Sequence, residues 1–129
     1  MNEVTIPLWG RVFSMRVEFD HYDDDVIPAK MESALDTFLD HLQDVQNSQD
    51  KLKEYCIKQD ADELVKLFGK AEIEDVFDVV MPDCLFVLRP EGHRRIALML
   101  DYRFDIDEGL ALLFVDEKLK SIGTQSSVF

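Results

Sequence analysis

Four acidic residues at four-residue intervals are the most conspicuous candidates for chemistry in this chain. They are Glu32, Asp36, Asp40 and Asp44. On one helix they would form a single stripe, because residues four positions apart lie on the same helix face. Like charges at that spacing repel and destabilise a helix by roughly 0.2–0.5 kcal/mol per pair. A stripe that weakens its own helix points to a basic partner.

The surrounding sequence strengthens this interpretation. The first fifty residues contain eleven acids and only three bases. No lysine or arginine lies three or four positions from any member of the stripe. Charge of one sign speeds association with an oppositely charged partner. The alternative interpretation is a helix face that contacts only solvent. The candidate partner-binding residues are Asp23, Asp24, Asp25, Glu32, Asp36, Asp40 and Asp44, and, in second rank, Asp105, Asp107 and Glu108.

Catalytic and metal-binding motifs are not apparent in the sequence. The acidic turn 101–109 approaches a calcium loop, but Arg103 occupies a ligand position and no helix is expected beside it. The three histidines are expected at the surface, the five glycines are isolated, and no serine lies in a nucleophile elbow. No Cys/His spacing matches a zinc site. We therefore expect a protein that is not an enzyme and binds no metal or cofactor.

Length and composition indicate one globular domain, residues 1–129. The chain has a mass of 15.0 kDa, 47% hydrophobic residues and a net charge of −13. That charge argues against binding to nucleic acid or to an anionic membrane, because both require cationic contacts. No signal peptide or transmembrane segment is apparent, so the expected location is the cytoplasm. Cys56 and Cys84 are expected to be reduced core thiols, with a disulfide between them left open.

Hydrophobic periodicity predicts the elements that must position the acids. Alternation predicts strands over 4–8 and 12–19, and helical spacing predicts one helix from Pro28 to Val45 that carries the whole stripe. Further helices are expected over 49–59 and 61–68, the latter ending at Gly69. Residues 70–82 have helical spacing and are ambiguous. Strands are then expected over 84–88, 96–100, 110–115 and 118–122.

This order of elements predicts an α+β fold. The expected sheet is antiparallel, built from an N-terminal hairpin and a C-terminal meander, with two or three helices packed on one face. The run 96–100 is almost entirely apolar, which is typical of a central strand covered on both faces. Trp9, Phe13 and Tyr22 lie near the acids in sequence and are candidate aromatic anchors, although Phe13 better suits the core.

The C-terminal third carries a family resemblance. Its pattern is Leu98-Met99-Leu100-Asp101-Tyr102, then Asp107-Glu108-Gly109-Leu110-Ala111-Leu112, then Ser121-Ile122-Gly123-Thr124-Gln125. This pattern resembles bacterial immunity-type domains associated with polymorphic toxins and contact-dependent inhibition. Those domains usually carry Glu-His-Gly where this chain has Asp107-Glu108-Gly109. The resemblance implies a stoichiometric binding protein.

The leading hypothesis from sequence is an immunity-type protein that neutralises a cognate, basic, nuclease-like toxin domain by electrostatic occlusion. The alternatives are a small-ligand-binding domain, an enzyme of unknown activity, or a homodimeric structural module joined through a sheet edge.

Overall fold

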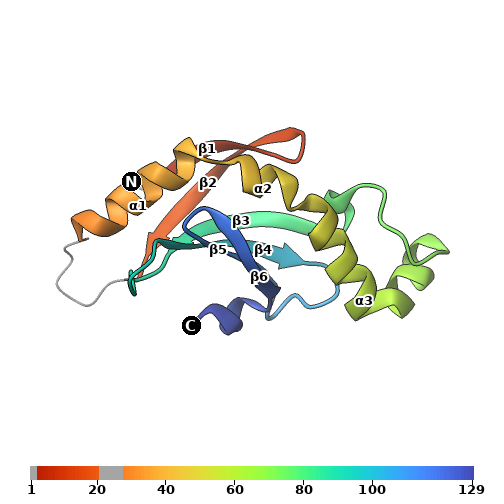
Figure 1. The fold of residues 1–129 in the computed structure, drawn as a ribbon. Helices are drawn as coiled ribbons and strands as arrows, with labels where there is room; N and C mark the ends of the chain where they lie inside the picture. The colour runs from red at the N-terminus through yellow and green to blue at the C-terminus, as the bar shows by residue number, and fades with distance from the viewer. Residues whose placement is uncertain (1–2, 21–27) are drawn as a thin grey trace.

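A six-stranded sheet forms the body of the protein in the computed structural model, which describes residues 3–20 and 28–129 (Figure 1). The strands lie in sequence order across the sheet. Their bounds are β1 Glu3–Leu8, β2 Arg11–Phe19, β3 Val80–Val87, β4 Arg95–Tyr102, β5 Leu110–Val115 and β6 Lys118–Gly123. All neighbouring pairs are antiparallel except β2 and β3, which are parallel, with Arg16 opposite Cys84. The α+β class is confirmed, and the sheet differs from the expected one at this single junction.

The parallel pair arises because the helical layer lies between β2 and β3 in the chain. Two strands joined by a short turn must run antiparallel, whereas a long crossover brings the chain back to start at the same end. Here the crossover contains three helices, α1 Ala29–Asp40, α2 Gln43–Asn47 and α3 Gln49–Phe68. Alternation within each strand is the same for either direction, so the sequence pattern did not distinguish them.

The single helix predicted from Pro28 to Val45 is wrong. α1 ends at Asp40, and His41 leaves the helical region with φ −136° and ψ 60°. The break is explained by contacts that α2 makes elsewhere. The Trp9 indole donates to the carbonyl of Val45 at 3.0 Å, and the Gln46 side chain donates to the carbonyl of Pro7. These two hydrogen bonds fasten α2 to the β1–β2 hairpin and so direct it away from the axis of α1.

α3 contains the break that the sequence predicted between its two halves. Asp60 has the non-helical angles φ −133° and ψ 38°, and the helix ends at Gly69 with φ 78°. The hydroxyl of the buried Tyr102 donates to the Asp60 carboxylate at 2.6 Å, which ties the break to β4. Burial, followed by this hydrogen bond, raises the pKa of Tyr102. The kink is thus held by a partly buried polar contact.

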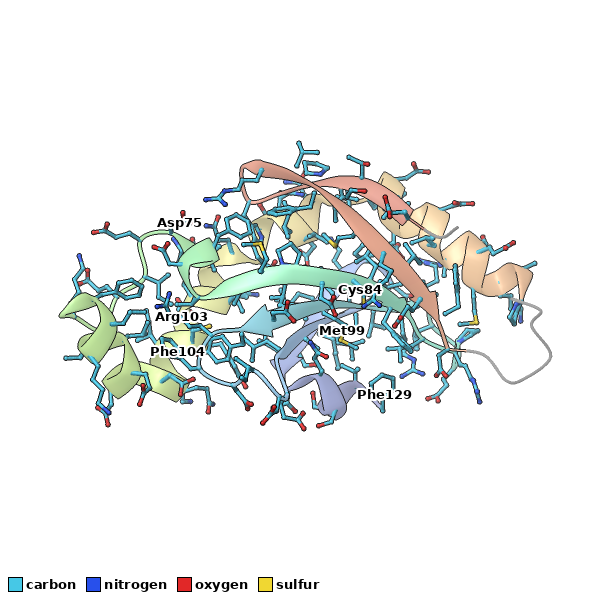
Figure 2. The ribbon with its side chains drawn as sticks, turned by 180° about the vertical axis from the view of Figure 1, so that it is seen from behind. Asp75, Cys84, Met99, Arg103, Phe104 and Phe129 are labelled. Atoms are coloured by element: carbon cyan, nitrogen blue, oxygen red, sulfur yellow. The ribbon has the colours of Figure 1, made fainter. Side chains whose placement is uncertain are left out.

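The two faces of the sheet are covered differently. The three helices cover one face, where Met31, Phe38 and Leu52 pack against apolar side chains of all six strands. The other face is covered by the short 3-10 helix η2, Gln125–Val128, which places Val128 over Cys84, Met99 and their neighbours. Figure 2 shows this rear side, with Cys84 and Met99 on the strands and Phe129 beside them. Every residue of the run 96–100 is buried, so the prediction of a central strand covered on both faces is confirmed.

The ambiguous segment 70–82 is mostly not helical. It contains one 3-10 turn, η1 Val76–Asp78, in which the Asp75 carboxylate accepts the Phe77 N–H at 2.9 Å. Pro82 lies inside β3, next to a register shift between Pro82 and Cys84, where a missing N–H is tolerated. Of the described helices, none combines the length and apolar character needed to cross a membrane.

Candidate acidic interface

The outer face of α1 presents three carboxylates to solvent. Glu32, Asp36 and Asp40 are exposed, whereas Met31 and Phe38 on the opposite face are each about 1% exposed. This amphipathic division follows from the helical period, because apolar side chains at three- and four-residue spacing all face the sheet. The acids are therefore left on one side, four residues apart, as the sequence predicted for this part of the stripe.

These three carboxylates are not neutralised by neighbours in the described structure. No ion pair joins Glu32, Asp36 or Asp40 to any lysine or arginine among residues 3–20 and 28–129. Elsewhere in the described structure, acids have arginine partners, as Asp75 before η1 has in Arg11 at 3.1 Å. The negative potential of α1 is consequently directed outward and available to a partner.

Asp44 has a different environment from the other members of the stripe. It lies on α2 and is half-buried, and its carboxylate accepts a hydrogen bond from the backbone N–H of Leu119 on β6. This bond attaches α2 to the edge of the sheet. Asp44 therefore has a structural role in addition to its charge, and the stripe is divided between two helices.

A cleft of about 440 Å³ adjoins the end of α1. It lies between the α1–α2 junction and the β5–β6 turn. Its lining contains four carboxylates and one lysine, namely Asp40, Asp44, Asp116, Glu117 and Lys118. Sequence reasoning missed Asp116 and Glu117. The signal that could have found them is the two-residue gap between strands 110–115 and 118–122, which predicts a tight hairpin turn. Both residues indeed have the positive φ that such a turn requires, 49° for Asp116 and 66° for Glu117.

The turn acids are held in place by basic groups from the β3–β4 connection. Arg94 binds both oxygens of Glu117, with Nε to Oε2 at 2.6 Å and Nη2 to Oε1 at 3.0 Å. His93 Nδ1 lies 2.7 Å from Asp116 Oδ2. The pKa of the Asp116 carboxyl lies below its usual value, first because of the His93 hydrogen bond and then because the Arg94 backbone N–H donates to it. The Asp116 carboxyl thus remains ionised and Glu117 is paired with Arg94, whereas Asp40 forms no ion pair with any described residue.

The second-rank acids lie elsewhere. Asp105, Asp107 and Glu108 occupy the β4–β5 connection, which Figure 1 shows at the end of the sheet away from α1. Asp105 accepts the backbone N–H of Glu108 at 3.2 Å, and Glu108 accepts the hydroxyl of Ser126 at 2.7 Å. The structure therefore does not bring these acids to the α1 face. Asp23, Asp24 and Asp25 lie outside the described residues.

The C-terminal motif has a structural explanation. Gly109 has φ +60°, and a Cβ there would lie 2.5 Å from both the Leu100 carbonyl oxygen and the Gln125 side-chain nitrogen. Gln125 in turn donates to the Leu100 carbonyl at 3.0 Å. The glycine thus allows the 3-10 helix η2 to approach β4 closely. The Glu108-Gly109 and Gln125 positions of the motif together fasten η2 to the rear face.

Two of the three aromatic anchors proposed from sequence pack inside the protein. Trp9 is about 9% exposed and contacts Phe77, with ring centroids 5.8 Å apart. Phe13 packs against the same ring at 5.2 Å. The prediction of Trp9 as a partner anchor is therefore wrong, whereas the core role of Phe13 is confirmed. Tyr22 lies outside the described residues.

Nucleophilic chemistry finds little support in the described side chains. Burial raises the pKa of both the Cys56 and Cys84 thiols to about 11, which keeps them protonated near neutral pH. Ser33 and His93 line one cleft, but no hydrogen bond joins their side chains in the described structure. No group of three or more candidate metal ligands occurs among the described residues. The arrangement of the site is thus one of surface charge.

Comparison with known proteins gives one match. No curated protein and no solved structure matches this chain. A family model does, over the whole of residues 1–129, and its description is a domain of unknown function, DUF6985. The match covers the helical layer and the C-terminal motif alike. The chain belongs to the DUF6985 family.

Proposed function

We propose that this protein is an immunity-type binding protein that neutralises a basic, nuclease-like toxin domain in the cytoplasm. The single observation that carries this proposal is the outer face of α1. Glu32, Asp36 and Asp40 are exposed there and form no ion pair with a described residue. Unneutralised charge of one sign favours fast and selective association with a cationic surface.

The adjoining cleft supports a specific mode of contact. It offers Asp40 unpaired, and Asp116 and Glu117 in fixed positions, within a volume of about 440 Å³. A long basic side chain of the partner fits such a site, because a lysine or arginine can align its stem with the cleft and place its charge among the carboxylates. The helix face would then steer the encounter, and the cleft would fix the orientation of the complex.

The proposed mechanism is physical occlusion. A nuclease keeps a cationic groove for phosphates, and an acidic protein can cover that groove with complementary charge. The resemblance of the C-terminal motif to immunity-type domains supports the same partner class. No chemical step is required of the inhibitor, so the expected relationship is one inhibitor for each toxin domain.

The experiment compares two charge-reversed variants in binding to the protein encoded by the gene next to this chain's own, which the proposal expects to be the toxin. Asp36→Lys/Asp40→Lys reverses two of the three α1 charges, and Asp62→Lys/Glu63→Lys makes an equal change on exposed residues of α3. Stopped-flow association at two salt concentrations should show the α1 variant slowed by about tenfold or more, with a weaker salt dependence. The α3 variant should remain within about twofold of the parent protein.

Two results would overturn this proposal. One is that both variants associate at the parent rate, which would remove the α1 face from recognition. The other is that the adjacent protein is neither bound nor inhibited by the parent chain. Circular dichroism and thermal unfolding provide the folding control, because both pairs of side chains are exposed and their reversal should leave the core intact.

A small-ligand-binding domain is the second candidate, because of one specific cleft. The described residues line a cleft of about 570 Å³ between the start of α1 and the β3–β4 connection. Lys30, Arg94 and Arg95 line it together with Asp116, and Arg94 is paired with Glu117 and Arg95 with Glu91. The exposed Lys30, which forms no ion pair with a described residue, is therefore the group that suits an anionic ligand. A thermal-shift screen of anionic metabolites tests this candidate, and an unchanged melting temperature throughout would exclude it at the concentrations used.

A further inference from the structure

A groove of about 370 Å³ separates α3 from β6, on the side of the molecule where the sheet ends. One wall is a single face of α3, and the other is the edge strand. Its base is apolar, because Tyr55, Leu119 and Ile122 are half-buried against the core. The full lining is Lys51, Glu54, Tyr55, Lys58, Leu119, Lys120, Ser121 and Ile122.

This groove is positively charged in a protein whose net charge is −13. Lys51, Lys58 and Lys120 are exposed in it, against one acid, Glu54. None of the three lysines forms an ion pair with a described residue, whereas other bases such as Lys66 and Lys70 do. The abundant carboxylates of the protein therefore leave this particular surface unneutralised.

β6 also has backbone groups available along the groove. It is the last strand of the sheet, paired with β5 on one side only. On its outer side, the Leu119 N–H donates to the Asp44 carboxylate, and no other β6 backbone group bonds outward to a described residue. The register shift between Leu113 and Phe114 leaves Lys120 without a direct partner on β5. An extended segment placed in the groove would therefore meet both lysine side chains and unpaired main-chain groups.

We propose that this groove binds an acidic, extended segment of a partner protein. Lysines on an edge strand repel basic strands and lose hydration against neutral ones, and so prevent indiscriminate pairing. An acidic strand converts that repulsion into attraction, which gives selectivity by the sign of the charge. A second copy of this chain, with a net charge of −13, and nucleic acid, with a charge on every phosphate, are repelled by the rest of the surface far more strongly than a short acidic segment is.

The test uses fluorescein-labelled peptides of about eight residues, which is the length of a long edge contact. One peptide alternates glutamate with valine, and its counterpart alternates lysine with valine. A single-stranded DNA oligomer is the third probe. Fluorescence polarisation with the full-length protein should detect the glutamate peptide alone. In amide NMR spectra, the resonances of 119–122 should shift, and those of 32–40 should not.

Matched variants decide whether the groove is responsible. Lys58→Glu/Lys120→Glu reverses two groove charges and should weaken binding of the glutamate peptide by about tenfold or more. Lys66→Glu/Lys70→Glu makes the same change in net charge outside the groove and should change affinity by less than about twofold. Thermal unfolding should be little altered in either variant, since all four side chains are exposed. The single change Lys120→Gln offers a milder variant and should weaken binding by an intermediate amount.

Several outcomes would overturn the inference. They are an undetectable interaction with the glutamate peptide, equal loss in the two double variants, equal or tighter binding of the lysine peptide or of the DNA, and dimerisation of the free protein through β6 seen by light scattering. The result is independent of the proposed function, because the α1 face carries the toxin contact and the groove carries opposite charge. Failure of one therefore leaves the other standing.

Discussion

Acidic residues occur in two regions of this protein with opposite consequences. On α1, Glu32 and Asp36 extend from the helix into solvent and form no ion pair with a described residue. In the β4–β5 connection, Asp105 and Glu108 are also exposed, but each accepts a hydrogen bond from the chain itself. The residue types are the same in both regions. The α1 carboxylates form no ion pair with a described residue, whereas the carboxylates of the connection hold the local fold through hydrogen bonds.

The difference comes from the backbone rather than from the side chains. Inside a helix, N–H groups donate to carbonyls one turn earlier, so Asp36 in the middle of α1 finds no donor nearby. Glu32 lies in the first turn, where the N–H groups of Met31 and Glu32 already donate to the Pro28 carbonyl. Turns and 3-10 segments leave N–H groups unpaired, and carboxylates satisfy them. An acidic cluster is therefore more informative about partners when it lies on a helix than when it lies in a turn.

The largest expected effect concerns the turn region. Gly109→Ala should destabilise the protein by about 3 kcal/mol, because a Cβ would overlap Leu100 and Gln125 in a left-handed conformation. Chemical denaturation provides the measurement. Gly92→Ala is the matched control, since Gly92 has φ +81° with nothing within 4 Å, and it should cost only about 1 kcal/mol. Equal losses in the two variants would show that close packing of η2 contributes little.

The next effect separates Asp44 from the rest of the stripe. Asp44→Ala should destabilise by about 1.5 kcal/mol, because the Leu119 N–H loses a charged acceptor. Asp40→Ala, at an exposed position four residues earlier, should stay within about 0.5 kcal/mol of the parent. Urea titrations of the two proteins give these values. An Asp44→Ala variant as stable as the parent protein would show that Asp44, like Asp40, has no structural role.

A smaller effect is expected at the end of the β4–β5 connection. Glu108→Ala should cost about 1 kcal/mol, since Ser126 loses its hydrogen-bond acceptor. Asp107→Ala, for which the described structure contains no such bond, should be close to neutral. Hydrogen exchange at 125–128 provides a second readout, and protection there should fall only in the Glu108 variant. Unchanged protection would argue against Glu108 as the group that holds η2.

The smallest effect has the opposite sign. Asp36→Asn should stabilise the protein by about 0.5 kcal/mol, because it removes the repulsion of Asp36 from both Glu32 and Asp40. The gain should diminish at high salt, where exposed charges are screened. Thermal unfolding at low and high ionic strength measures both. A destabilised variant would mean that Asp36 has a structural partner and would weaken the contrast between the regions.

Local pattern was sufficient to predict most elements but not all of their arrangement. Alternation located β1 and β2, and the apolar run 96–100 identified the buried central strand. The break at His41 was not predictable, because neither His41 nor Leu42 is a helix breaker. Its cause is the attachment of α2 to distant parts of the chain.

The candidate site was predictable to a similar extent. Helical spacing placed Glu32, Asp36 and Asp40 on one exposed face, as the structure has them. The roles of Asp44 and Glu108 depend on donors that are far away in sequence, at Leu119 and Ser126. A sequence pattern contains no information about such donors. The lysine groove was not predictable from sequence for the same reason, since its two walls come from separate parts of the chain.

The parallel junction between β2 and β3 affects how the chain reaches its folded state. Arg16 and Asp83, which meet across this junction, are separated by 67 residues in sequence. Contacts over such separations slow folding, because a long loop must close before the strands gain from pairing. On the ribosome, the N-terminal hairpin would emerge long before its neighbour in the sheet. Its apolar side must therefore stay unattached until the whole helical layer has been synthesised, which makes this interval the stage most exposed to aggregation.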